Sequence, residues 1–319
     1  FIYGEIGGGP GPEHCYTTGL CYQYFMTGNQ RYKKAVLQLT DWLDCVFEGS
    51  GTLLERLFQF KNKDLPNLKR LLSGATIQRY KYPFTRGTGN YISTLLDAYN
   101  ITGDRSYISK IEKVIQDSMH PCDDINLRDL EDTEFTWSYL VYLQSVCKYI
   151  DLKIRLNETD YACLYARDSL LHYTEWMLEN EKPFLEAPDK LEYTNHTWAA
   201  QDLRKANIFY VASQYTEQRR DEYLEAARYY TAYVENTLIN EETRYYSRIL
   251  ILLMQNYIDE SSLDFHSTRT IRDSNTNNYS NPPLYSIANI LTGFIGDIFS
   301  RLCRLSINNE RRWLSFRVK

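Results

Sequence analysis

The feature that most constrains this chain is a helical hairpin that occurs three times in its sequence. Each copy has an apolar segment with helical spacing, a polar turn and a second amphipathic segment, and the fullest copy covers residues 193–234. The first two copies superpose at an offset of 75 residues, which aligns Thr27-Gly28 with Thr102-Gly103. The third copy follows at a further offset of 116 residues. Hairpins that cannot bury their apolar faces alone must stack on one another, so the repeat predicts a layered helical protein.

The remaining sequence continues the helical pattern. Residues 66–84 and 259–283 lack it and are predicted to be connections. The last residues, 311–319, alternate weakly and are compatible with the first strand of a further domain. We therefore predict an all-α protein. Outside the third copy, the predicted helices lie at residues 13–26, 31–47, 89–101, 106–119, 135–155, 160–179, 245–258 and 285–303.

Five or six such hairpins can form an open solenoid or close into a ring. A solenoid repeats tightly, at about 34 to 47 residues, whereas the copies here are irregularly spaced and separated by long polar connections. Long insertions on one face of a fold are typical of binding clefts. We therefore predict a closed α/α toroid of five or six helical hairpins. The chain then divides into a Gly/Pro-rich lead-in at residues 1–12, the toroid at residues 13–304 and an extension at residues 305–319, the possible start of another domain.

Composition excludes several functional classes. The formal net charge of −5 argues against nucleic-acid binding, which requires a basic patch. No run of 18 apolar residues occurs, so no membrane span is predicted. The seven cysteines lack CxxC spacing, and neither a metal site nor a cofactor is predicted. Glycosylation sequons, which matter only in a secreted eukaryotic protein, occur at Asn100, Asn157, Asn195 and Asn278.

The aligned repeats also bring polar residues together. Leu20, Leu95 and Val211 occupy equivalent positions, so the starts of their helices should converge on one mouth of the ring. Helix N-termini carry positive partial charge and unpaired N–H groups, so this mouth should favour anions. Its arginines either grip a carboxylate or sulfate or form structural pairs with acidic neighbours. The residues predicted to gather there are Glu13, His14, Arg86, Asn90, Asp202, Arg204 and Lys205.

Histidines and aromatic residues near the same helix starts are candidates for catalysis and sugar stacking. His14 and His196 could act as general acid or base, or be ordinary hydrogen-bonded core histidines. The 28 tyrosines of the chain could fill helix contacts or line a sugar-binding cleft. Tyr82 could serve as a platform or as an acid. The predicted stacking platforms are Trp137, Tyr139 and Trp198.

The hairpins carry Y-x-x-T-G-[ND]-x-x-Y at their turns, and the blocks EHCYTTGL, TRGTGNY and HTWAAQDLRKAN stand at inner helix starts. In these features the chain resembles the α/α toroid domain of polysaccharide lyases, heparinase-like and ulvan-lyase-like, and of related glycoside hydrolases. The resemblance implies an acidic polysaccharide or oligosaccharide as partner and a secreted or periplasmic location. It also implies a companion β-rich domain or subunit, which this sequence lacks.

For such a lyase, the resemblance implies β-elimination on a uronate-containing polysaccharide. His14 or His196 would be the base and Tyr82 the acid, while Arg86, Asn90 and Arg204 would neutralise the uronate carboxylate. A glycoside hydrolase is the alternative enzyme, using two of Glu13, Glu192 and Asp202 about 5 to 10 Å apart. A third alternative is a toroid that binds glycan, or has a structural role, without catalysis.

Overall fold

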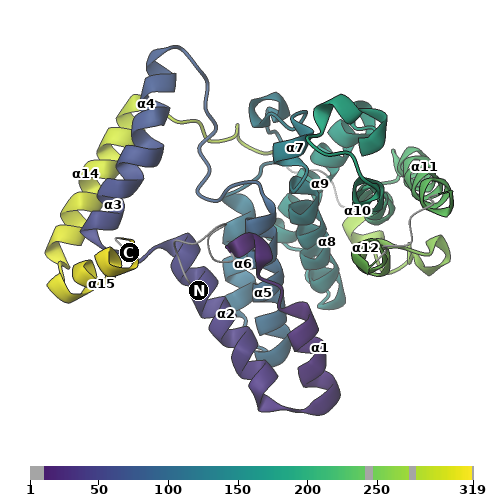
Figure 1. Cartoon of the computed structure of the whole chain (residues 1–319), viewed down its shortest axis with the longest axis horizontal. Coiled ribbons are helices and arrows are strands. Elements are labelled where there is room, and N and C mark those ends of the chain that lie inside the picture. The colour runs from purple at the N-terminus through teal and green to yellow at the C-terminus, as the bar shows by residue number, and fades with distance from the viewer. Residues whose placement is uncertain (1–10, 241–246, 273–277, 318–319) are drawn as a thin grey trace.

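The structure, a computed structural model, describes residues 11–240, 247–272 and 278–317. These residues form helices joined by turns and loops (Figure 1), and the described part of the chain has only one isolated β-bridge, between Gln78 and Leu284. The all-α prediction is confirmed. No helix within the described ranges is both long enough and apolar enough to cross a membrane.

Four helical hairpins and one further helix form the body of the described structure. The first helices of the hairpins pack side by side in chain order, and α12 packs against the last of them. The second helices cover the outside of this row, where α2 also packs on α5 and α9 on α6. The hairpins are α1 (Thr18–Thr27) with α2 (Gln30–Glu48), α5 (Arg86–Thr102) with α6 (Ser106–Gln116), α8 (Tyr139–Arg155) with α9 (Tyr161–Asn180), and α10 (His196–Ser213) with α11 (Arg220–Ile239); the last helix of the body is α12 (Ser247–Asn256).

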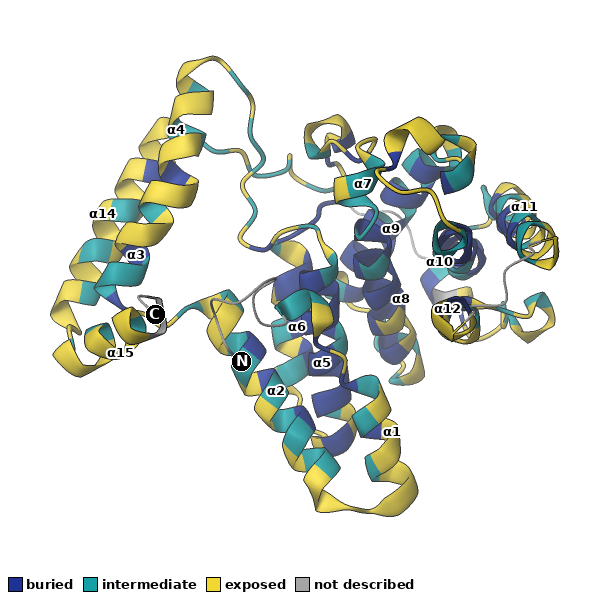
Figure 2. Ribbon diagram, viewed as in Figure 1, coloured by how far each residue is buried: buried dark blue, intermediate teal, exposed yellow. Residues whose placement is uncertain are grey.

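Burial is greatest in three of the inner helices. Twelve residues are buried in each of α5, α8 and α10, so these helices are covered on nearly all sides. By contrast, α2 buries only Val36, Thr40 and Leu43, on one face. Figure 2 shows the same contrast, with dark blue concentrated on the central helices. The apolar core therefore lies between the two layers of hairpins.

The Thr-Gly-Asn/Asp repeat explains how two of the hairpins turn. Gly28 and Gly103 follow the last residues of α1 and α5 with φ of 66° and 73°, a left-handed conformation that glycine adopts without steric cost. Asn29 and Asp104 then accept hydrogen bonds from the N–H groups two residues later, at 3.0 and 2.9 Å. Each turn thus ends one helix and starts the next.

Four helices form a separate arm beside the body (Figure 1). A π-helical segment (Phe60–Asp64) joins α3 (Leu53–Gln59) to α4 (Leu65–Leu72), and both helices pack against α14 (Ile287–Cys303). The last helix, α15 (Ile307–Arg317), packs on α3. A strand over residues 311–319 is therefore wrong for the residues that are described. The Glu310 carboxylate accepts hydrogen bonds from the N–H groups of Leu53 and Leu54. This tertiary contact favours a helix in a segment whose alternation of apolar and polar residues was too weak to specify a strand.

Three segments join the arm to the body, at residues 49–52, 73–85 and 278–286. The last two run side by side, since the N–H of Arg79 donates to Pro283 O at 2.7 Å and that of Tyr285 to Ile77 O at 2.9 Å. The predicted lead-in at residues 1–10 lies outside the described residues. The other connections contain short helices only: η1 (Pro12–His14), η3 (Ile125–Arg128), α7 (Thr133–Thr136), η4 (Phe184–Glu186), η5 (Pro188–Lys190), η6 (Glu260–Ser262) and α13 (Arg269–Arg272).

Candidate anion-binding cavity

A cavity of about 960 Å³ lies along the row of inner helices. Each inner helix contributes side chains from one face to the lining of this cavity. Residues three or four positions apart in a helix lie on the same face, so the lining residues of one helix are about one turn apart. The polar lining of the cavity comes mainly from Tyr16 and Tyr22 before and in α1, Asn90 and Ser93 in α5, Gln144, Lys148 and Asp151 in α8, Arg204 and Asn207 in α10, Gln214 just after α10, and Asn256 in α12.

Arg204 is the central cation of this cavity, and its partners there are amides. Its Nε donates to Gln201 Oε1 at 2.7 Å, and its Nη1 donates to Gln144 Oε1 at 2.6 Å and to Asn256 Oδ1 at 3.4 Å. Within the described ranges, no carboxylate forms an ion pair with Arg204. Desolvation lowers the pKa of Arg204 to about 10, and the nearby Arg86 also lowers it. A desolvated cation held only by neutral oxygens is well placed to bind an anion.

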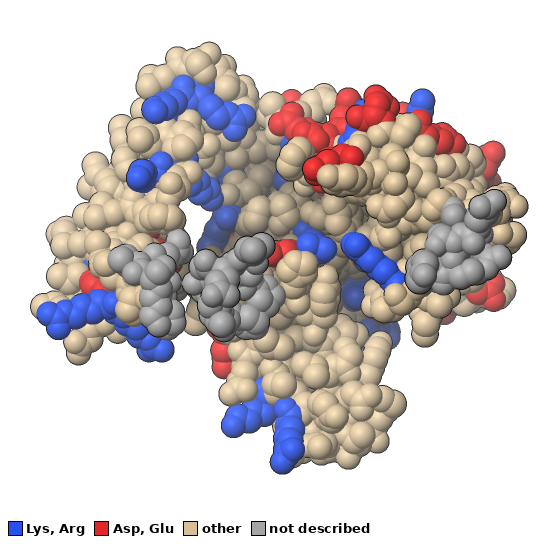
Figure 3. Space-filling model, in the orientation of Figure 1, with Lys and Arg blue, Asp and Glu red and all other residues tan. Residues whose placement is uncertain are grey.

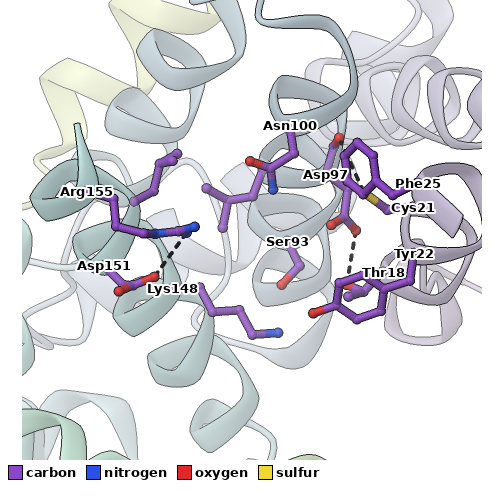
Figure 4. A pocket seen from close by; sticks show the side chains of 12 residues that line it. Thr18, Cys21, Tyr22, Phe25, Ser93, Asp97, Asn100, Lys148, Asp151 and Arg155 are labelled. Carbon is purple, nitrogen blue, oxygen red and sulfur yellow. Dashed lines mark hydrogen bonds and ion pairs between the residues drawn. The ribbon is translucent and has the colours of Figure 1, made fainter. Parts of the chain in front are cut away.

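Lys148 adds a second cation on the wall formed by α8. Its side chain points between α5 and α8 into an adjoining pocket of about 400 Å³ (Figure 4), and it also lines the larger cavity. It reaches solvent there. Desolvation by the surrounding helices lowers the pKa of Lys148, which the nearby Asp97 raises in part and Arg204 lowers further. The two cations come from different helices but face the same space.

The carboxylates around these pockets are already engaged. Asp97 is buried and accepts a hydrogen bond from Thr17 Oγ1 at 2.6 Å. It accepts a second from Thr18 Oγ1 at 3.0 Å (Figure 4). Its burial raises the pKa of the Asp97 carboxyl. Asp151 forms an ion pair with Arg155 at 3.0 Å. Asp264, also in the lining, accepts hydrogen bonds from the N–H groups of His266 and Ser267 at 2.8 and 3.1 Å. Among the residues that the structure describes, neither Arg204 nor Lys148 therefore has a carboxylate in contact.

Several residues predicted for the mouth do lie together, at the starts of α5, α8 and α10. The Asn90 amide donates to Pro12 O in η1 at 2.9 Å, and η1, which holds Glu13 and His14, packs on α5. The Arg86 guanidinium lies 5.5 Å from the ring centre of Trp137. Trp137 in turn contacts Trp198 edge to face, with ring centres 5.9 Å apart. These contacts join the starts of neighbouring inner helices, including α8, which was not one of the aligned repeats.

Tyr139, Asp202 and Lys205 lie elsewhere, in a buried cluster between α8, α9 and α10. The Lys205 ammonium lies 2.7 Å from Glu181 Oε2 and 3.1 Å from Asp202 Oδ1, and Tyr139 Oη donates to Glu181 Oε1 at 2.6 Å. Desolvation raises the pKa of Asp202 to about 7 despite the nearby Lys205. These groups pair with one another in the core and do not line the cavity.

The predicted acid and bases also lie away from the cavity lining. Tyr82 is buried between α2 and α5, where its hydroxyl donates to Glu48 at 2.5 Å. Burial and this carboxylate raise the pKa of Tyr82 well above its usual value. His14 is exposed at the end of η1, and His196 is the partly buried first residue of α10. None of the three is among the residues that line the cavity.

Sequence reasoning missed Gln144, Lys148 and Asn256. Gln144 and Lys148 stand four residues apart in the otherwise apolar segment YLVYLQSVCKYI, which is the spacing of one helix face. Two polar residues on one face of an otherwise apolar helix could therefore have indicated, from the sequence alone, that this face lines a cavity. Asn256 ends the apolar segment ILILLMQN, and nothing in the sequence links it to Arg204.

Within the described ranges, no group of three or more His, Cys, Asp and Glu residues is arranged to hold a metal ion. Comparison of the chain with protein-family models, with curated proteins and with solved structures finds no match.

Proposed function

We propose that this chain is built on the plan of an α/α toroid and binds an acidic oligosaccharide in the cavity of its inner helices. Parallel rows of inner and outer helices support that plan. The observation that carries the binding proposal is Arg204, a desolvated cation whose partners there are the amide oxygens of Gln201, Gln144 and Asn256. A uronate carboxylate would supply the missing negative charge through paired N–H···O bonds.

The rest of the lining suits a sugar. Tyr16 and Tyr22 are each 62% exposed, so each offers an aromatic face and a hydroxyl. Ser93, Asn207 and Gln214 add donors and acceptors for sugar hydroxyls. A volume of about 960 Å³ is at the upper end of ordinary ligand pockets and has room for more than one sugar ring. A secreted or periplasmic location and a companion β-rich domain or subunit belong to the same proposal.

The reaction we propose is β-elimination. Arg204 would stabilise the charge that develops on the uronate carboxylate when the neighbouring carbon loses its proton. A base takes that proton, a carbon–carbon double bond forms, and the glycosidic oxygen leaves with a proton from an acid. We assign the base to the phenolate form of Tyr16, which becomes the neutral phenol on taking the proton, in place of His14 or His196, because Tyr16 lines the cavity and the two histidines do not.

A hydrolase receives less support from the same geometry. Of its three candidate carboxylates, Asp202 is fully buried beside Lys205, and Glu13 and Glu192 do not line the cavity. The carboxylates in and beside the cavity already have partners: Asp97 accepts from two threonines, Asp151 pairs with Arg155, and Asp264 accepts from the N–H groups of His266 and Ser267. A cation-centred cavity fits binding of a carboxylate better than protonation of a glycosidic bond by a pair of acids.

The binding test is calorimetric titration with uronate-containing oligosaccharides and with matched neutral ones. Arg204→Gln should weaken binding about 10-fold to 100-fold, the usual effect of losing a charged hydrogen bond, while Arg204→Lys should retain part of it. Arg228→Gln is the matched control, because Arg228 is an exposed arginine on α11 that pairs with Glu260. Equal affinity for neutral sugars, or unchanged affinity in Arg204→Gln, would refute the binding proposal.

The reaction is tested separately by the ultraviolet absorbance of an unsaturated uronyl product. Tyr16→Phe should abolish the rise in absorbance and leave binding nearly unchanged. Binding without any product from the intact protein would exclude β-elimination and leave a glycan-binding protein. Product formation that persists in Tyr16→Phe would show that another residue is the base.

A further inference from the structure

The arm presents a continuous apolar face to solvent. On α14, Ile287, Leu291, Ile295, Phe299 and Leu302 are 40% to 70% exposed, and their spacing of four, four, four and three residues places them on one side of the helix. From residue 287 to residue 300 the only charged side chain is Asp297, which pairs with Arg56 and points away from this face of α14. The exposed face of α14 is therefore uncharged over about 20 Å of helix.

The other arm helices also expose apolar side chains. Leu72 in α4 is 73% exposed and Ile307 in α15 is 66% exposed, while Leu57 and Phe58 in α3 are each 44% exposed. The arm is thin, because α3 and α4 pack on α14 without a third layer behind them. Figure 2 accordingly shows mostly exposed residues along these helices. Apolar patches of this extent are uncommon on proteins that stay free in solution.

The arm is also basic within an acidic chain. Residues 53–72 and 287–317 contain ten Lys and Arg and four Asp and Glu, a formal charge of +6, whereas the whole chain carries −5. Figure 3 shows Lys and Arg on the arm, while most of the visible Asp and Glu lie on the body. A surface of opposite charge would therefore attract the arm selectively.

The few acidic residues of the arm do not neutralise these cations. Arg56 binds Asp64 at 2.7 Å and Asp297 at 2.8 Å. Glu55 is held by Ser50, and Glu310 by the N–H groups at the start of α3. Within the described ranges, seven cations of the arm form no ion pair, and one of them, Lys63, donates only to the carbonyl of Tyr80; the seven are Lys61, Lys63, Lys69, Arg70, Arg304, Arg311 and Arg312.

We propose that the arm docks on the surface of a lipid bilayer that contains anionic lipids, with α14 lying in the plane of the interface. Such a surface offers apolar acyl chains to the exposed face of α14 and negative headgroups to the surrounding cations. At 17 residues, α14 is about 25 Å long and would lie along the surface. A second copy of the chain fits less well, because face-to-face arms of +6 each would repel one another.

The test is flotation of the full chain with vesicles of phosphatidylcholine alone and with vesicles that also contain phosphatidylserine. Binding is expected only to the anionic vesicles and should weaken as salt is added. Ile295→Asp/Phe299→Asp should abolish it, and both sites are exposed enough for the fold to tolerate the change. Lys69→Gln/Arg70→Gln should weaken it about 30-fold, since each cation near an anionic surface contributes roughly a factor of five.

Phe135→Asp is the matched control, because Phe135 is an apolar residue of the body that is 81% exposed. It should bind vesicles like the unmodified chain. Absence of vesicle binding, equal binding to neutral vesicles, or equal loss in Phe135→Asp would overturn the proposal. So would a dimer in sedimentation analysis that Ile295→Asp/Phe299→Asp dissociates, since the apolar face would then be an interface between two copies.

Discussion

The closest approach between two inner helices provides a sharp test of the fold. Gly89 lies in the first turns of α5, against α8. A Cβ added there would lie 2.8 Å from Tyr142 Cα and 2.9 Å from Val141 O. Both are backbone atoms, so no side-chain rotation can make room. Gly89→Ala therefore requires α5 and α8 to separate by several tenths of an ångström or more.

The magnitude follows from two opposing effects. Replacing a helical glycine by alanine normally stabilises a helix by about 0.5–1 kcal/mol, because it restricts the unfolded chain. Overpacking of a tight contact costs about 1–3 kcal/mol, and a backbone clash belongs at the upper end of that range. We expect a net loss of about 1–2 kcal/mol in the free energy of unfolding.

Urea denaturation measures this loss as a lower midpoint at an unchanged slope. The matched variant is Gly19→Ala in α1, because a Cβ added at Gly19 meets nothing within 4 Å. It should leave the midpoint unchanged or raise it slightly. If Gly89→Ala proves as stable as Gly19→Ala, the close packing of α5 on α8 is incorrect, and with it the wall of the cavity that carries Gln144 and Lys148.

Two further predictions concern buried charges. Because the pKa of Asp202 is about 7 when folded and about 4 when unfolded, the folded chain holds this proton more tightly, so its stability should fall as pH rises from about 4 to 7. Asp202→Asn should remove that dependence in thermal melts recorded across this range, and an unchanged profile would contradict the assignment. Lys153→Met leaves the carboxylates of Glu112, Glu158 and Asp160 without their shared cation and should cost about 2–4 kcal/mol at pH 7. Lys153 lowers the pKa of Glu158 and Asp160, so its stabilising effect is lost as pH falls below about 4, and the deficit of Lys153→Met should shrink there; a deficit that grows on acidification would refute this account.

Local signals in the sequence were sufficient for the hairpins. Thr-Gly-Asn and Thr-Gly-Asp specify a helix end and the next helix start within three residues, so those boundaries could be predicted without tertiary information. The arm could not be predicted in this way, because its helices are held together by packing between segments that are distant in the sequence. Pro66 suggested a break, although it stands in the first turn of α4, where proline is tolerated.

Within the site, the sequence could not resolve which side of a helix faces the cavity. Arg204 and Lys205 are adjacent, so their side chains point about 100° apart around α10. Arg204 faces the cavity, while Lys205 is fully buried beside Glu181 and Asp202. Both were predicted for the same mouth because each is a cation near a helix start. Only the packing of α9 against α10 distinguishes them.

The arm also has a consequence for how the protein is made. Its two halves are separated by more than 200 residues, since α4 ends at Leu72 and α14 begins at Ile287. At ordinary rates of synthesis the first half leaves the ribosome roughly 10 to 40 s before the second half exists. During that interval Phe60 lacks Phe294 of α14, on which its ring packs, and Arg56 lacks its partner Asp297, while the hairpins of the body can fold locally. The arm is therefore the last part of the molecule to form, and nascent chains should be most vulnerable to chaperone capture and proteolysis within residues 53–72.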